Sequence, residues 1–392
     1  MARWVLAVWG VCLWGHVAHA GVKVPVDDAS WLSVGALVQP FALVQQEPAG
    51  APSRSFQLSP ALRRARLQLG GQLGPHVHLF METDTPFLGL NNSWQGRLLH
   101  HTALVELIAS PVLQVDMGLM VLPFSRHVMQ GAGALLSLDI AQRATDEVQG
   151  PATAAPLHHS PWRDVGVMAR GELLGGSLEY RVAVSPGVTK GAGGEAVNPH
   201  AMPRFTARVA VNLLDAEAGP GVGGFFYEGV TLEDHDGVLT SPKRFLSVGA
   251  SASYQPDTHV LGAGRLGDTR ALAVDVFVDL PLDAAGSRAV TGQVDYFHLD
   301  AGADHPQSGH AVFAEAGMRF DRVEPTASFE WVDPRGAPVG SFLAVRGGLA
   351  YWLRGTQCHV KVDFGAQGTG AAGTPAHRAL RFVARAQTQV AF

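Results

Sequence analysis

The chain ends in the stretch LRFVARAQTQVAF, residues 380–392, and this stretch decides the fold class. Its residues form two alternating sets. One set is mostly apolar and comprises Phe382, Ala384, Ala386, Thr388 and Val390. The other is mostly polar and comprises Arg381, Val383, Arg385, Gln387, Gln389 and Ala391. Because successive side chains of a β-strand point to opposite faces, the stretch predicts a strand with one lipid-compatible face and one wet face.

The same period of two recurs along the chain, for example at residues 177–184, 204–211, 271–280 and 357–364. It predicts strands at residues 31–44, 56–73, 76–84, 97–109, 111–121, 163–172, 176–184, 203–214, 244–255, 269–280, 288–299, 310–320, 323–332, 341–353, 356–366 and 379–392. An even number of strands allows an antiparallel barrel to close. We therefore expect an all-β protein, a transmembrane antiparallel β-barrel of about 16 strands. A soluble β-sandwich also alternates, but it would need neither such long strands nor a terminal aromatic residue.

The composition supports a membrane barrel. Hydrophobic residues make up 47% of the chain and charged residues 16%, with 46 glycines and a mean hydropathy of +0.11. This apolar content is high for a secreted soluble protein, yet it is spread too evenly for membrane helices. The formal net charge of −5 argues against a nucleic-acid partner.

The first twenty residues, 1–20, are predicted to be a secretory signal peptide. Arg3 supplies positive charge, Trp4 to Trp14 form a short apolar core, and Ala18 to Ala20 form a cleavage site of the A-x-A type. The mature barrel domain would then cover residues 21–392. Removal of Cys12 with the signal leaves Cys358 alone, so no intramolecular disulfide is expected.

Connections between the predicted strands differ in length. Short turns at one end and long loops at the other are typical of an outer-membrane barrel. The longest gap, residues 122–162, is our candidate for a constriction loop that folds inward. We expect the apolar piece at 223–229 to belong to a long external loop, and the acidic run 233–236 to lie in an external loop near lipopolysaccharide.

Several blocks resemble the phosphate-selective porin O and P family. They are SPALRRARLQLGGQLG at 59–74, RDVGVMARGELLGGSLEYRVAVSPG at 163–187, RFTARVAVNLLD at 204–215, residues 243–254 and the terminal strand. The resemblance implies a sixteen-stranded, commonly trimeric channel for small ions or solutes in the bacterial outer membrane. The terminal Phe392 resembles the assembly signal of outer-membrane proteins, which implies the barrel assembly machinery as a partner, beside outer-membrane lipid and lipopolysaccharide.

In that family, arginines on the wet face form a ladder that attracts anions, because a guanidinium stays charged and grips phosphate with two hydrogen bonds. The candidates here are Arg64, Arg66, Arg170, Arg181, Arg204, Arg208, Arg319, Arg346, Arg381 and Arg385. Arg63 points the other way unless a bulge intervenes. An equally weighted alternative is that these arginines are solvated or paired with acids. The wet face also carries Glu82, Glu106, Asp116, Glu172, Glu179, Asp275, Asp295, Glu315, Glu330 and Asp363, so we predict passive diffusion, with phosphate or other anions as candidate solutes.

Other sequence motifs give no support for a cofactor site, a metal site or a catalytic site. The G-x-G-x-x-G match at 262–267 lies between predicted strands with no helix after it, so it fails as a dinucleotide site. Histidine pairs such as His100 with His101 lack the spacing of a zinc site, and no cofactor or metal is expected. No G-x-S-x-G or H-E-x-x-H occurs, so we do not expect an enzyme. A barrel hydrolase and a structural barrel plugged by its own loop stay open as alternatives.

Overall fold

A computed structural model describes residues 21–46, 55–90, 93–94, 96, 98–141, 162–188, 197–217, 222–235, 238–241, 243–261, 264–300, 308–334, 339–371 and 380–392. The predicted signal peptide, residues 1–20, lies outside the described residues and stays a prediction. In the described part, no helix is long and apolar enough to cross a bilayer.

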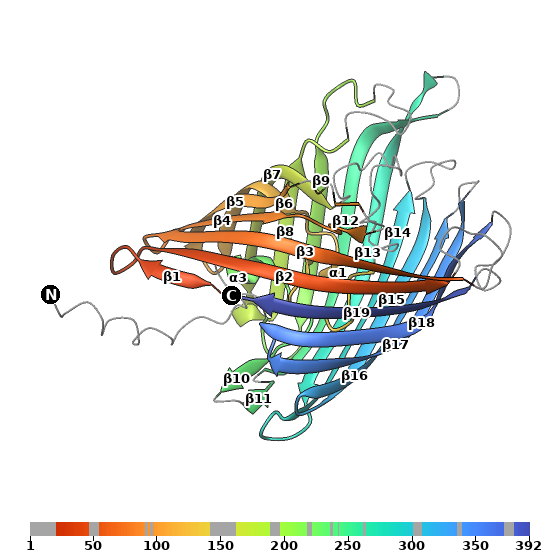
Figure 1. Cartoon of the computed structure of the whole chain (residues 1–392). Helices are drawn as coiled ribbons and strands as arrows, with labels where there is room; N and C mark the ends of the chain where they lie inside the picture. The colour runs from red at the N-terminus through yellow and green to blue at the C-terminus, as the bar shows by residue number, and fades with distance from the viewer. Residues whose placement is uncertain are drawn as a thin grey trace.

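A closed antiparallel barrel forms the wall of the protein (Figure 1). Its first half comprises β2 (Trp31–Gln46), β3 (Phe56–Leu73), β4 (Val77–Asp84), β5 (Leu99–Ser110), β6 (Leu113–Val121), β7 (Arg163–Leu173), β8 (Leu178–Ser185) and β9 (Arg204–Asn212). Its second half comprises β12 (Phe245–Val260), β13 (Leu266–Pro281), β14 (Arg288–Asp300), β15 (Gly309–Phe320), β16 (Val323–Pro334), β17 (Val339–Arg354), β18 (Cys358–Ala371) and β19 (Arg381–Ala391). Each strand pairs with the next, and β19 closes on β2. The prediction of a sixteen-stranded barrel is confirmed.

The two faces of the wall follow the period of two. On β13, Leu272, Val274 and Val276 are 52%, 49% and 41% exposed, whereas the alternating Ala273 and Asp275 are buried. The outer face therefore offers aliphatic side chains to a lipid-like environment, and the inner face carries the polar and charged groups. Because the barrel is closed, each wall strand pairs with a neighbour on both sides, so the backbone satisfies its hydrogen bonds between strands, as an apolar environment requires.

A short strand, β1 (Val22–Pro25), precedes the barrel and was not predicted. It runs antiparallel to β2, with Val22 opposite Val34. The last strand reaches only as far as Leu37 on β2, which lies opposite Ala391. β1 thus lies along the part of β2 that extends past the end of β19. With four residues, β1 is too short for its alternation to have stood out in the sequence.

Antiparallel strands place successive connections at alternate ends of the barrel. The long-loop end carries residues 47–55, 85–98, 122–162 and 186–203, whereas the short-turn end carries 74–76, 111–112, 174–177, 282–287, 321–322 and 355–357. The long connection between β9 and β12, residues 213–244, belongs to the short-turn end because it follows the eighth strand of the wall. Our placement of 223–229 and of 233–235 in an external loop was therefore wrong, and residue 236 lies outside the described residues.

This connection, which we call the inner insert, has structure of its own. It contains helix α3 (Val222–Phe225) and the small hairpin of β10 (Glu233–His235) and β11 (Val238–Thr240). The hairpin lies at the same end of the barrel as β1 and the C-terminus (Figure 1). From the end of α3 to the start of β10, the insert lies inside the bore, where Phe225, Tyr227 and Val230 are buried.

Candidate functional site

The candidate site is the bore itself, which two segments enter from opposite ends. From the long-loop end comes the described part of the predicted constriction loop, residues 122–141, which we call the inward loop. It contains helix α1 (Arg126–Met129), capped by the Ser125 side chain. The Arg126 backbone N–H donates to Asp275 at 3.2 Å, so α1 packs against the inner face of β13. The expected inward fold is thus confirmed for residues 122–141, while 142–161 lie outside the described residues.

The rest of the inward loop crosses to the opposite wall. Gln39 on β2 donates to the carbonyl of Ala132 at 3.4 Å, and Gln389 on β19 donates to the carbonyl of Gly133 at 3.0 Å. Lys361 on β18 donates to the carbonyl of Leu135. The loop is therefore tied by its backbone to β2, β18 and β19, as well as to β13 through α1.

Asp139, near the C-terminal end of the inward loop, holds the loop against β3. It accepts from Arg63 Nε at 2.5 Å and from Arg64 Nη2 at 2.9 Å, and all three side chains are almost wholly buried. Although burial opposes ionisation, the two guanidinium groups hold the pKa of Asp139 well below its ordinary value. One carboxylate thus joins the loop to β3 by two charge-assisted hydrogen bonds.

A β-bulge brings both arginines to the same side. Gln39 pairs with Arg64 and Pro40 pairs with Leu62, which leaves Arg63 as the extra residue. The bulge reverses the alternation, so Arg63 continues the inward set before it and Arg64 begins the inward set after it. From the sequence, Arg63 was expected to point outward unless a bulge intervened. The bulge is present, so Arg63 points inward. Arg64, Arg66 and Gln68 share one face, as predicted.

The inner insert meets the inward loop near the middle of the bore. The Gly131 N–H donates to the Tyr227 carbonyl at 2.9 Å, and the Tyr227 N–H donates to the Met129 carbonyl at 3.0 Å. The Tyr227 hydroxyl donates to Glu179 at 2.6 Å and accepts from Arg208 Nε at 3.1 Å. Burial raises the pKa of Tyr227 to about 12, so the hydroxyl keeps its proton for this bond.

Arg126 is the main charged link between the two segments. Its guanidinium pairs with Glu217 and donates from Nη2 to the carbonyl of Glu228 at 2.6 Å. It also stacks 3.5 Å from the ring centroid of Phe277 and 4.8 Å from that of Tyr227. The inward loop, the inner insert and the β13 wall therefore share one buried cation.

Apolar side chains fill much of the remaining bore. The Phe124 and Trp162 rings stack at 3.5 Å beside Phe297 and Phe313 of the wall. A second cluster joins Leu136 of the inward loop, Val230 and Leu239 of the insert, and Trp352 of β17. Much of the barrel interior is thus a packed core and not open water.

Most of the predicted arginine ladder is buried and engaged in this packing. Among the described residues, Arg170 pairs with Glu106 and Asp116, Arg181 with Glu179, Arg208 with Asp275, and Arg385 with Asp363. Three others donate hydrogen bonds to neutral groups: Arg319 to Ser241 and the Gly286 carbonyl, Arg346 to Gln367, and Arg381 to the Leu380 carbonyl. The remaining one, Arg204, is buried. These contacts agree with the alternative that the arginines are paired. A role for them in conduction is untested.

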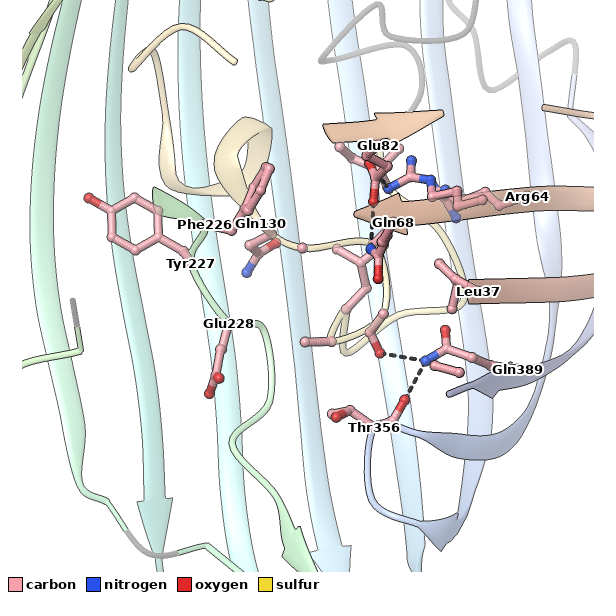
Figure 2. Close-up of a pocket in the computed structure, with 18 of the residues that line it drawn as sticks. Leu37, Arg64, Gln68, Glu82, Gln130, Phe226, Tyr227, Glu228, Thr356 and Gln389 are labelled. Carbon is pink, nitrogen blue, oxygen red and sulfur yellow. Dashed lines mark hydrogen bonds and ion pairs between the residues drawn. The ribbon is translucent and has the colours of Figure 1, made fainter. Parts of the chain in front are cut away.

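A cavity lies along the wall formed by β2, β3, β4 and β19 (Figure 2). It holds about 910 Å³ of space, part of it open to solvent. The wall side carries Leu37, Arg64, Arg66, Gln68, Phe80, Glu82, Gln389 and Ala391. The other side carries Gln130 to Leu135 and Ile140 of the inward loop and Phe226, Tyr227 and Glu228 of the insert. Arg163, at the long-loop end of β7, and Thr356, in a short turn, also line it, so the cavity draws on both ends of the barrel.

The charged groups of the cavity wall form a network. Arg66 donates to Asp84 at 2.9 Å and to Glu82 at 3.0 Å. Glu82 also accepts from Gln68 at 2.7 Å and contacts the His101 ring at 2.7 Å. Cation and carboxylate therefore sit side by side on this wall, and the cavity presents fixed dipoles more than a net positive surface.

Of the ten candidate arginines, Arg64 and Arg66 line this cavity and the other eight do not. Sequence reasoning missed Arg163, which its parity placed on the outer face, but which lies at the strand end where alternation no longer holds. It also missed Gln130, Tyr227 and Glu228, since nothing in their local sequence shows that the two connections meet inside the barrel.

Phe392 lies at the seam where the barrel closes. Its N–H donates to the Ala36 carbonyl at 3.0 Å, and its carbonyl accepts from the Ala36 N–H at 2.6 Å. The residue is 63% exposed, so its side chain contributes little to packing within the chain.

Deletion of Phe392 should therefore lower membrane assembly more than synthesis. Two seam hydrogen bonds are lost, each worth about 0.5–1.5 kcal/mol, and so is the terminal aromatic residue that the resemblance implies is read during assembly. The measurement is the fraction of heat-modifiable protein in the membrane relative to total protein. Phe392→Tyr, which keeps the backbone and the aromatic ring, is the control. A normal heat-modifiable fraction after deletion would refute the assignment.

Comparison with known proteins shows which solved structures share this fold. No protein-family model matches the chain, and no curated protein sequence matches it. Among solved structures, the outer-membrane channel DcaP of Acinetobacter baumannii has a TM-score of 0.58 at 11% identity, covering 95% of this chain and 100% of that one. An anion-selective porin from Comamonas acidovorans has a TM-score of 0.57 at 13% identity, covering 93% of this chain and 100% of that one. Salmonella typhi OmpF in complex with daunomycin has a TM-score of 0.55 at 12% identity, covering 95% of this chain and 100% of that one. The chain therefore has the fold of the bacterial outer-membrane porins.

Proposed function

We propose that the protein is an outer-membrane porin through which small ions or solutes diffuse along the cavity beside β2, β3, β4 and β19. The observation that carries this proposal is the set of cavity-lining residues. It runs from Arg163 at the long-loop end to Thr356 at the short-turn end, while packed apolar side chains fill the bore along β5 to β8 and β13 to β15. A narrow, polar, partly charged passage suits passive diffusion.

We infer that the passage has at most a weak intrinsic preference for anions. The phosphate-selective resemblance would require arginines free to bind an anion. Arg64 is engaged by Asp139 and Arg66 by Glu82 and Asp84. Carboxylates beside the guanidinium groups offset the positive field that would attract phosphate. Phosphate remains a candidate solute among other small ions.

The proposed setting is the bacterial outer membrane. The exposed aliphatic outer face supports contact with lipid and lipopolysaccharide, and the seam at Phe392 supports delivery by the barrel assembly machinery. A homotrimer is part of the proposal: one of the solved structures with this fold, OmpT of Vibrio cholerae, is described as a trimer form.

A plugged structural barrel is the second candidate, and the apolar clusters that join both inward segments to the wall favour it. Single-channel recording in planar bilayers separates the two. The proposed function predicts discrete current steps from purified, folded protein, whereas a plug predicts traces equal to those of lipid alone. A hydrolysis assay on lipid and ester substrates, run on the same preparation, tests the remaining enzyme alternative. Hydrolysis without current would favour that alternative.

A further inference from the structure

The inner insert places one acidic side chain on the cavity, opposite the arginine-bearing wall. Figure 2 shows Tyr227 and Glu228 on one side of the cavity and Arg64, Gln68 and Glu82 on the other. Glu228 comes from the short-turn end of the barrel, whereas the loop that carries Gln130 comes from the long-loop end. An ion that passes through the cavity therefore travels between Glu228 and the wall.

The backbone of Glu228 is held in place on both sides. Its carbonyl accepts from Arg126 Nη2 at 2.6 Å, and its N–H donates to Glu217 Oε1 at 2.7 Å. Both contacts use only main-chain atoms of Glu228, and its own side chain takes part in neither. In the part of the chain that the structure describes, the Glu228 carboxylate has no hydrogen bond or ion pair, although Arg64 and Arg66 on the facing wall are both paired with carboxylates. Among the described residues, none offsets the charge of Glu228 by direct contact.

We propose that Glu228 is a selectivity-determining residue of the channel. Its ionised carboxylate favours the passage of cations. Its protonated form carries no charge, so the arginines of the wall then have the larger effect on ion selectivity. The inference rests on the proposed channel function. A fixed charge in a narrow, low-dielectric bore raises the local concentration of its counter-ion, and it acts more strongly when no neighbouring charge cancels it.

The surroundings set the pH range in which Glu228 changes charge. Burial and the nearby Glu217 raise its pKa to about 7, Lys243 and Arg126 oppose the rise, and Asp279 adds to it. From across the cavity, Arg64, Arg66 and Arg163 also face it, together with Glu82. Because the raised pKa lies near neutrality, the carboxyl is mostly neutral below that pH and mostly charged above it.

The test is the K⁺ to Cl⁻ permeability ratio, measured from reversal potentials across an asymmetric KCl gradient at about pH 5.5 and about pH 8.5. Wild-type protein should show a ratio about two- to tenfold higher at the upper pH. Glu228→Gln should remove this difference, and Glu228→Asp should keep part of it. Glu172→Gln, the same change at a half-buried glutamate that does not line the cavity, should behave as wild type. Heat-modifiability confirms that each variant is folded.

The outcomes separate the two proposals. Current without a pH-dependent ratio, or a dependence that persists in Glu228→Gln, would overturn the role of Glu228 and leave the channel standing. Absence of current in wild-type protein at both pH values would overturn the channel, and the selectivity role with it. A dependence abolished in Glu228→Gln and retained in Glu172→Gln supports the inference.

Discussion

Replacement of Asp139 by Ala should release the inward loop from the β3 wall, widen the passage and turn it toward anions. Asp139 joins Arg63 and Arg64, and its loss leaves both buried guanidinium groups without a carboxylate. Breaking a buried ion pair from one side costs about 3–5 kcal/mol, which corresponds to a shift of about two to three and a half powers of ten toward the released loop. The measurements are single-channel conductance and the reversal potential in a salt gradient, and both should change.

Two controls define this result. Asp268→Ala removes an acid that pairs at 3.5 Å with the largely exposed Arg270, and such surface pairs contribute little. It should leave conductance and reversal potential unchanged. Combining Arg63→Gln and Arg64→Gln with Asp139→Asn removes all three charges together, so the shift toward anions should largely disappear. If Asp139→Ala conducts with wild-type conductance and selectivity, Asp139 does not restrain the passage.

Replacement of Arg126 by Met should detach the inner insert from the inward loop. The methionine keeps an apolar stem between Phe277 and Tyr227, but it cannot pair with Glu217 or bind the Glu228 carbonyl. The side chain of Glu217 is only 6% exposed, so it would lose its cation inside the protein, again at a cost of about 3–5 kcal/mol. Conductance should rise, and the insert should become a site of limited proteolysis in folded protein.

Arg126→Lys is the matched variant, because it restores the positive charge without the planar fork. We expect it to recover part of the wild-type conductance and protease resistance. Arg270→Met, at a largely exposed arginine, should change neither property. An insert that stays protease-resistant in Arg126→Met, with unchanged conductance, would mean that apolar packing alone holds it in the bore.

The wall of the barrel could be predicted because its signal is local and repeated. Alternation alone gave every wall strand to within a few residues, except at ends such as those of β12 and β18. There the strands run on to Val260 and Ala371, through stretches without regular alternation. Strand counting could also have placed the inner insert. The segment follows the eighth predicted strand, and an even count returns the chain to the end where it began.

The filled bore was harder to predict, although a trace of it is present in the sequence. Phe277, Phe297 and Phe313 have the same parity as Asp275, Asp295 and Glu315, so aromatic residues occur on a face otherwise assigned to water. All three are buried in the structure, and Phe297 and Phe313 belong to the main apolar cluster. Inward aromatic residues can therefore indicate that something packs inside a barrel.

Pairing between distant segments could not be read from the sequence. Arg208 on β9 meets Asp275 on β13 across β12, and Arg63 meets a loop residue, Asp139. Such contacts depend on strand register and on the path of the connections, neither of which local alternation fixes. For this reason the arginines could be assigned to the inner face, while their partners and their distance from the cavity could not.

We expect the path of solutes to lie beside β2 and β3, and not through the packed side chains along β13 to β15. This expectation can be tested with cysteines introduced into a Cys358→Ser background, using a cationic thiol reagent during bilayer recording. Gln68 lines the cavity, whereas Gln293 is buried on β14 against Gln130, at 2.5 Å, and Asp295. We predict that the reagent reduces the current through Gln68→Cys and leaves the current through Gln293→Cys unchanged. Block of Gln293→Cys, or modified Gln68→Cys that conducts normally, would contradict it.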